Sequence, residues 1–161
     1  MTSKDRDSGG DTDLQTLPEL WSRLHGITCL TFESRSEAGT GWDGTGRGDV
    51  RVSELSPNVL TFEESGAWSP RVGIETRFTN TFRWTAGNDS LRLEHLRFGV
   101  DNPVLLFDLI PSVHGEWREA ESHHCGEDCY SGILKVVGPQ IVFTWSVRGP
   151  RKQEAIRYLY S

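Results

Sequence analysis

A short segment near the C-terminus brings together side chains that could do acid–base chemistry. From residue 123 to residue 130 the chain reads HHCGEDCY, which places imidazole, thiol, carboxyl and phenol groups close together. A carboxylate can orient an imidazole and a tyrosine can act as an acid, so His123, Asp128 and Tyr130 form a candidate acid–base set. In the alternative, these residues tie down a turn and Tyr130 closes the fold. We favour the structural alternative, because networks of this kind also occur away from active sites.

The same segment contains the ligand types of a zinc site. Zinc usually takes four ligands from two separated pairs, whereas here all candidates crowd one turn and adjacent histidines point to opposite faces of a strand. A site would need a further ligand from across the fold, so we assign no metal and no cofactor. A haem-binding version, with one histidine as axial ligand, remains an alternative. The residues weighed as ligands are His123, His124, Cys125 and Cys129, with His95 or His114 to complete the set.

Two β-rich runs follow this segment and are expected to pair. Residues 128–137 and 141–147 flank a Gly138-Pro139 turn, the arrangement of a β-hairpin. In a hairpin centred on that turn, Tyr130 and Trp145 become cross-strand or diagonal neighbours. We therefore expect one end of the fold to gather His123, Asp128, Tyr130 and Trp145, with Lys152 returning there after Gly149-Pro150.

The elements that must position this segment are one helix and many strands. The stretch from Thr16 to Glu19 has the form of a capping box, and apolar residues recur with helical spacing up to Leu24, so residues 17–24 predict a short amphipathic helix. The remaining chain alternates short β-rich runs with turns and predicts a single all-β antiparallel barrel of about eight to ten strands. The helix is expected to act as a lid or plug.

Two stretches carry particular expectations. Gly44, Gly46 and Gly48 alternate along one face of a strand, which favours close packing or a barrel corner. The next strand, residues 59–64, is expected to end at Ser65-Gly66. Residues 72–84 alternate well, and one face of that strand carries Ile74, Thr76, Phe78, Asn80, Phe82 and Trp84.

Composition limits the class of protein. The 161-residue chain predicts a polar, disordered tail at residues 1–13 and one domain at residues 14–161. Its net charge of −6 argues against nucleic acid as a partner. No apolar run approaches the roughly 20 residues of a membrane helix, and no secretory signal is visible, so we expect a cytoplasmic protein with reduced thiols and no membrane partner.

Two motifs carry a family resemblance. His-x-Cys-x-x-Asp-x-Tyr at 123–130 and Trp-x-Val-x-Gly-Pro-x-Lys at 145–152 resemble a bacterial lipocalin-like, calycin-type barrel family of unknown function. Phe62-x-Glu64-x-Gly66 and Asp108-Leu109 also fit the pattern of that family. The chain departs from it after the helix, where Gly26-Ile27-Thr28 replaces the usual Gly-x-Trp. The resemblance implies a divergent lipocalin-like barrel and supplies no known ligand.

These observations favour a binding protein over an enzyme. We expect a small apolar or amphipathic molecule inside the barrel, because aromatic residues are frequent and a barrel of this size can enclose a cavity. The alternatives are a small barrel enzyme that uses the acid–base set defined above and a non-catalytic structural or interaction module. The residues expected to contact the ligand are His123, Asp128, Tyr130, Trp145, Lys152, Glu64 and Trp84.

Overall fold

The structure is a computed structural model that describes residues 16–37, 41–112, 115–120 and 123–161. For residues 123–125 it describes the backbone only. The predicted tail at residues 1–13 lies outside the described residues.

Helix α1, Leu17–His25, confirms the predicted helix and extends it by one residue. The Thr16 side chain accepts a hydrogen bond from the Glu19 backbone N–H, and the Glu19 carboxylate accepts one from the Thr16 N–H. This reciprocal capping box satisfies N–H groups that have no partner inside the helix. The apolar stripe of the helix buries Leu20 and Leu24 completely.

Strands make up most of the described chain. In most strands with described side chains, alternating burial puts one face toward the core and the other toward solvent. The strands are β1 Cys29–Ser36, β2 Gly44–Ser56, β3 Val59–Pro70, β4 Thr76–Ala86, β5 Leu91–His95, β6 Val104–Pro111, β7 Trp117–Glu119, β8 His123–Cys125, β9 Asp128–Val137, β10 Gln140–Arg148 and β11 Gln153–Tyr160.

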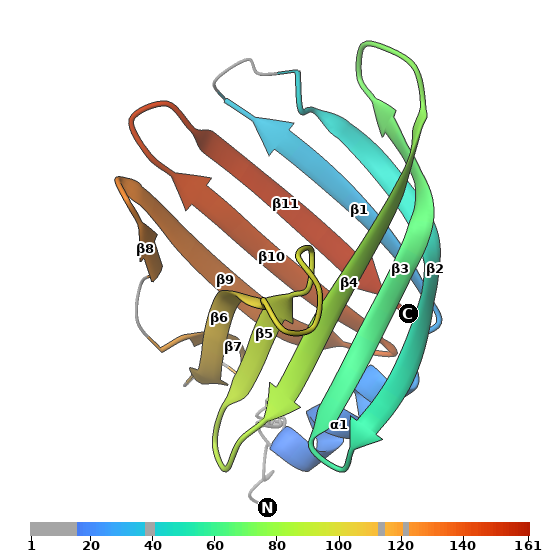
Figure 1. The fold of residues 1–161 in the computed structure, drawn as a ribbon, viewed down its shortest axis with the longest axis vertical. Helices are drawn as coiled ribbons and strands as arrows, with labels where there is room; N and C mark the ends of the chain where they lie inside the picture. Colours follow the sequence, from blue (N-terminus) through green and yellow to red (C-terminus); the bar gives the residue numbers. More distant parts are fainter. Residues whose placement is uncertain (1–15, 38–40, 113–114, 121–122) are drawn as a thin grey trace, which may run out of the picture.

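The strands close into an antiparallel barrel (Figure 1). The sheet order is β10-β11-β1-β2-β3-β4-β5-β6-β7-β9, and pairing of β9 with β10 joins its two ends. Strand β8 pairs with residues 128–130 at the start of β9, and β7 pairs with residues 133–134 further along the same strand. The predicted all-β barrel with one short helix is therefore confirmed, with ten strands in the ring among the described residues.

Strand boundaries around the β3–β4 connection were predicted wrongly. The strand predicted over residues 72–84 is β4, which begins only at Thr76, because the chain turns at Gly73 with a φ of 130°. Ile74, predicted to share a face with Phe82, is therefore exposed ahead of the strand.

Strand β3 does not end at Ser65-Gly66 but continues to Pro70. Gly66 lies directly opposite Gly48 of β2, and a Cβ on Gly66 would overlap the Arg47 carbonyl oxygen. Here glycine permits the two backbones to approach closely, and the ladder of hydrogen bonds continues through it.

Helix α1 covers one end of the barrel, called here the helix end (Figure 1). Trp21 Nε1 donates to the carbonyl of Pro57 in the β2–β3 turn at 3.2 Å, and Arg23 donates to the carbonyl of Gly138 in the β9–β10 turn at 2.6 Å. Beneath the helix the core is filled by aromatic rings in edge contact, among them Phe62 against Trp84 and Phe107 against Phe143. The helix therefore plugs this end. The opposite end, with the β1–β2, β3–β4 and β10–β11 connections, is called the far end.

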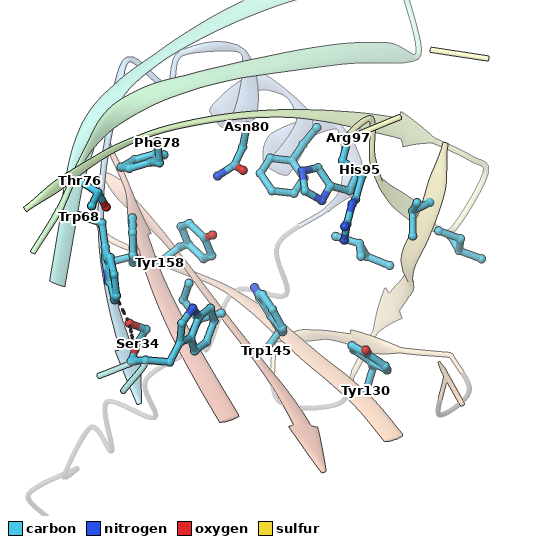
Figure 2. A pocket seen from close by; sticks show the side chains of 17 residues that line it. Ser34, Trp68, Thr76, Phe78, Asn80, His95, Arg97, Tyr130, Trp145 and Tyr158 are labelled. Atoms are coloured by element: carbon cyan, nitrogen blue, oxygen red, sulfur yellow. Dashed lines mark hydrogen bonds between the residues drawn. The ribbon is translucent and has the colours of Figure 1, made fainter. Parts of the chain in front are cut away.

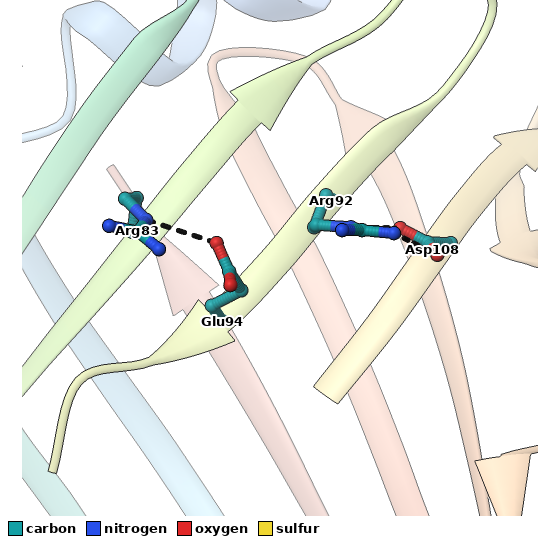
Figure 3. A network of polar contacts seen from close by, with 4 residues as sticks. All are labelled: Arg83, Arg92, Glu94 and Asp108. Atoms are coloured by element: carbon teal, nitrogen blue, oxygen red, sulfur yellow. Dashed lines mark hydrogen bonds and ion pairs between the residues drawn. The ribbon is translucent and has the colours of Figure 1, made fainter. Parts of the chain in front are cut away.

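Ion pairs cross the outer face of β4, β5 and β6 (Figure 3). Arg83 Nε lies 3.0 Å from Glu94 Oε1, and Arg92 binds both carboxylate oxygens of Asp108 at 2.8 and 3.0 Å. Asp108, one of the residues that fit the family pattern, thus pairs with its neighbouring strand on the outside of the barrel.

Candidate binding cavity

A cavity of about 490 Å³ occupies the barrel between its packed core and the far end (Figure 2). Most of its walls are aromatic or aliphatic, and a few polar groups reach into it. It is lined by Phe32, Ser34, Trp42, Trp68, Thr76, Phe78, Asn80, Phe82, His95, Arg97, Val104, Leu105, Leu106, Tyr130, Trp145, Ile156 and Tyr158.

Gly46 makes room for the ring of Phe32 on this wall. Gly46 of β2 faces inward directly opposite Phe32 of β1, and a Cβ at Gly46 would overlap the Phe32 ring. The ring contacts Phe78 at 5.4 Å and Tyr158 at 5.4 Å between centroids. The close packing predicted from the alternation of Gly44, Gly46 and Gly48 is therefore present, and at Gly46 it lets the Phe32 ring lie against the sheet.

The polar groups of the cavity lie on two sides. On one side, Ser34 Oγ donates to the Trp42 carbonyl at 2.7 Å and accepts from Trp68 Nε1 at 3.4 Å (Figure 2). On the other, the His95 ring stacks on Phe82 with centroids 4.6 Å apart. Burial, and next the charge of Arg97, lower the pKa of His95 below its ordinary value. The environment therefore favours the neutral form of His95.

Glu64 is buried beside the cavity, with 2% of its surface exposed. Its Oε1 accepts a hydrogen bond from the Tyr160 hydroxyl at 2.7 Å, whereas Oε2 has no hydrogen-bond partner among the described residues. Burial raises the pKa of Glu64 to about 7, opposed by the Tyr160 hydroxyl and the Asn80 amide. The carboxyl therefore changes its charge near neutral pH, inside the protein.

The predicted hairpin and its register are confirmed. Strands β9 and β10 pair across the Gly138-Pro139 turn, with Tyr130 opposite Val147 and Gly132 opposite Trp145. Tyr130 and Trp145 are thus diagonal neighbours on the same inward face, and both line the cavity.

Two other predicted site residues, Glu64 and Trp84, lie deeper in the barrel and do not line the cavity. Asn80 and Tyr158 stand between Glu64 and the cavity, since both line it and both interact with the Glu64 carboxyl. Trp84 is 1% exposed and packs against Phe143 in the core beneath the cavity. Its indole N–H has no partner among the described residues.

The remaining predicted residues lie at the same end of the hairpin but do not line the cavity. Asp128 begins β9, and its carboxylate lies against Gly149. Lys152 is exposed, and its carbonyl accepts a hydrogen bond from the Gly149 N–H at 2.8 Å. The backbone of His123 pairs with Tyr130, while its side chain lies outside the described part. Ligand binding by these three residues stays a prediction.

Sequence reasoning did not single out several groups of the cavity wall. Asn80 carries a signal that could have been used, because it is the one amide on the otherwise largely apolar face of β4. Tyr158 and Tyr160 alternate on the inward face of β11 and stack with centroids 5.5 Å apart. The sequence suggested His95 only as a zinc ligand, and for Arg97 it gives no such pattern, because Arg97 stands beyond the end of β5 in an irregular connection.

No group of three or more His, Cys, Asp or Glu side chains that could hold a metal ion occurs among the described residues. Of the residues weighed as zinc ligands, His123, His124, Cys125 and His114 have side chains outside that part, so the zinc alternative stays untested. Cys29 and Cys129 are free thiols.

Residues 31–161 match the sequence pattern of DUF6314, a family of unknown function. The chain belongs to this family. No curated protein matches it. The matched range includes every residue that lines the cavity, from Phe32 to Tyr158.

Three solved structures are similar to this chain, two of them described as a redesigned or de novo designed β-barrel. A redesigned β-barrel, mFAP1, bound to DFHBI shares 15% identity over 86% of this chain and 97% of its own, with a TM-score of 0.42. EF1p2_mFAP2b bound to DFHBI shares 15% identity over 87% and 94%, with a TM-score of 0.44. A de novo designed fluorescence-activating β-barrel shares 13% over 86% and 95%, with a TM-score of 0.42. These scores are too low to support a conclusion about function.

In the described chain, no helix has the length and apolar character needed to span a membrane.

Proposed function

We propose that this DUF6314 protein binds a small apolar or amphipathic molecule inside the far half of its barrel. The observation that carries the proposal is the cavity of about 490 Å³ with largely aromatic walls. Ligand sites in proteins typically measure roughly 300–1,000 Å³ and combine apolar walls with a few polar groups that orient the ligand.

The two ends of the barrel differ in a way that supports binding. At the helix end, large side chains such as Trp84 and Phe143 are completely or almost completely buried and fill the interior. Near the far end the rings stand along the walls and leave space between them. A structural or interaction module has no need of a hollow interior, so the cavity favours the binding function over that alternative.

The enzyme alternative draws less support from the site. Of its acid–base set, Tyr130 lines the cavity and Asp128 does not. Arg83, a basic residue that could otherwise attract an acidic ligand, is engaged by Glu94 on the outer face. The polar groups of the cavity wall best placed to orient a ligand are instead Asn80 and Arg97.

A cavity-filling variant tests the proposal. Ile156 of β11 faces the cavity, so Ile156→Trp places an indole inside it, whereas Arg157→Trp adds the same group to the outer face of the same strand. The probe is 1-anilinonaphthalene-8-sulfonate, with binding followed by probe fluorescence. We expect Ile156→Trp to weaken binding by at least about tenfold and Arg157→Trp to leave it within about twofold, since one buried ring displaces the probe.

Organic extraction of freshly purified protein, followed by mass spectrometry, tests the same proposal by searching for a natural ligand that co-purifies. A compound enriched in wild type and depleted in Ile156→Trp would support it. Equal probe binding by both variants, together with no variant-dependent compound, would contradict it.

A further inference from the structure

Asn80 stands between the cavity and a buried carboxyl. It lies directly opposite Glu64 in the pairing of β3 with β4, so both side chains occupy the inward face. Asn80 lines the cavity, and its amide points into it (Figure 2). Glu64 does not line the cavity and acts on it only through its neighbours.

The surroundings of Glu64 leave one oxygen for Asn80. The titratable groups that face the carboxyl are Tyr160 and Tyr158, both on β11, and burial raises the pKa of both hydroxyls so that they stay neutral. On β2 the opposite residue is the apolar Val50. No described cation forms an ion pair with Glu64. Oε1 already accepts a hydrogen bond from Tyr160. The unpartnered Oε2 is therefore the oxygen available to the Asn80 amide.

An amide has a donor end and an acceptor end, and directing one toward Glu64 turns the other toward the cavity. The Asn80 amide stabilises the charged form of Glu64, as its N–H₂ end does when it faces the carboxylate. We infer that Glu64 orients Asn80 so that the cavity wall presents a carbonyl acceptor, and that the ligand is an aromatic molecule that buries a hydrogen-bond donor against Asn80. This inference rests on the proposed function. The aromatic character follows from the cavity walls, which include Trp68, Trp145 and Tyr158.

Protonation of Glu64 reverses the arrangement. A neutral carboxyl donates from the oxygen that carries its proton, so Asn80 then turns its carbonyl toward Glu64 and its N–H₂ toward the cavity. Because burial raises the pKa of Glu64 to about 7, this reversal falls in the neutral range. Glu64 is thus a positioning residue that sets whether the cavity accepts or donates a hydrogen bond.

Two uncharged probes of nearly the same shape test the inference. 2-Naphthol carries a hydroxyl donor, and 2-methoxynaphthalene lacks it. Near pH 8, where Glu64 is ionised, equilibrium dialysis is expected to show 2-naphthol binding about fivefold more tightly, the value of one ordinary hydrogen bond. Near pH 5 the two Kd values are expected to converge to within about twofold, since a neutral Glu64 turns the donor of Asn80 inward.

Glu64→Gln supplies the matched variant. Tyr160 still donates to the carbonyl oxygen of the new glutamine side chain. The N–H₂ group of that glutamine then takes the place of Oε2 and mimics the protonated, neutral acid. We expect this variant to show the low-pH ratio of Kd values at every pH. Glu63→Gln is the control, because it makes the same charge change on the outer face of β3, where Glu63 pairs with Arg51.

The possible failures are distinct. One outcome is that neither pH nor Glu64→Gln changes the ratio of the two Kd values, while Ile156→Trp still blocks binding. This would overturn the inference and leave the proposed binding function intact. An equal change in Glu63→Gln would overturn it as well, because the effect would then follow overall charge. Absence of binding by both probes, or binding that Ile156→Trp leaves unaltered, would overturn the proposed function together with the inference.

Discussion

Burial of the Glu64 carboxylate opposes folding when that group is ionised. Glu64 is 2% exposed, has no ion-pair partner among the described residues and accepts a hydrogen bond of 2.7 Å from Tyr160. Its folded-state pKa of about 7 lies above the ordinary value of 4.5. A raised carboxyl pKa means that the neutral form favours folding and that ionisation opposes it.

The pH dependence of stability follows from this sign. The stabilising contribution of neutral Glu64 is fully present below about pH 4.5 and is lost as the pH rises through about 7. Glu64→Gln is expected to remove this dependence and to raise the free energy of unfolding near pH 8 by about 3 kcal/mol, the value of the shift. Urea denaturation at a series of pH values measures it, with Glu63→Gln as control. Parallel curves for wild type and Glu64→Gln would contradict the expectation.

At the scale of elements, β2 and β3 form a close-packed corner of the barrel. Gly48 and Gly66 face each other, and a Cβ on either would overlap backbone atoms of the other strand. Backbone atoms held in a ladder cannot move aside as a flexible side chain can. The two long strands therefore depend on glycine at this contact.

Gly66→Ala is expected to lower the free energy of unfolding by about 1–3 kcal/mol, because the strands must separate to admit the methyl group. Gly26→Ala is the control: its φ is −87° and its nearest neighbour to a new Cβ lies at 3.7 Å. Chemical denaturation compares the two. An equal, small effect of both substitutions would show that the corner can relax.

Helix α1 is the second element on which the barrel depends. Leu24 is completely buried at the helix end, whereas Ser22 on the same helix is exposed. Leu24→Ala is expected to cost about 2–5 kcal/mol, through lost burial and the cavity left behind, and Ser22→Ala less than about 0.5 kcal/mol. Thermal denaturation tests this. A small loss for Leu24→Ala would mean that the helix covers the barrel without sealing it.

At the scale of the whole molecule, the barrel is packed at one end and hollow at the other. The pairing of β4 with β5 covers Phe82–Ala86 only, so residues 76–80 of β4 have no strand partner on that side among the described residues. The same residues include three that line the cavity, Thr76, Phe78 and Asn80. The cavity wall is therefore supported by fewer hydrogen bonds than the core beneath the helix.

Amide hydrogen exchange is expected to follow this division. Residues 76–80 should exchange faster than residues 82–86 of the same strand, because local opening requires fewer contacts to break. Adding 2-naphthol should slow exchange at residues 76–80 more than at 82–86. Uniform protection along β4, with and without the probe, would contradict a separate, ligand-supported far half.

The sequence by itself determined the local architecture. The capping box and apolar spacing predicted α1, alternation predicted most strands, and the Gly138-Pro139 turn predicted the β9–β10 hairpin and the shared face of Tyr130 and Trp145. These features depend on residues close in sequence, where helix and strand periodicities leave a direct trace.

Only the tertiary structure decided where the barrel is hollow and which polar groups reach its interior. Closure brings Tyr160 of β11 against the paired strands β3 and β4, so the environment of Glu64 depends on a residue far away in sequence. The same closure left Asp128 and Lys152 off the cavity and put His95 and Arg97 on it. Burial and register across distant strands fix such a site, and no local pattern in the sequence records them.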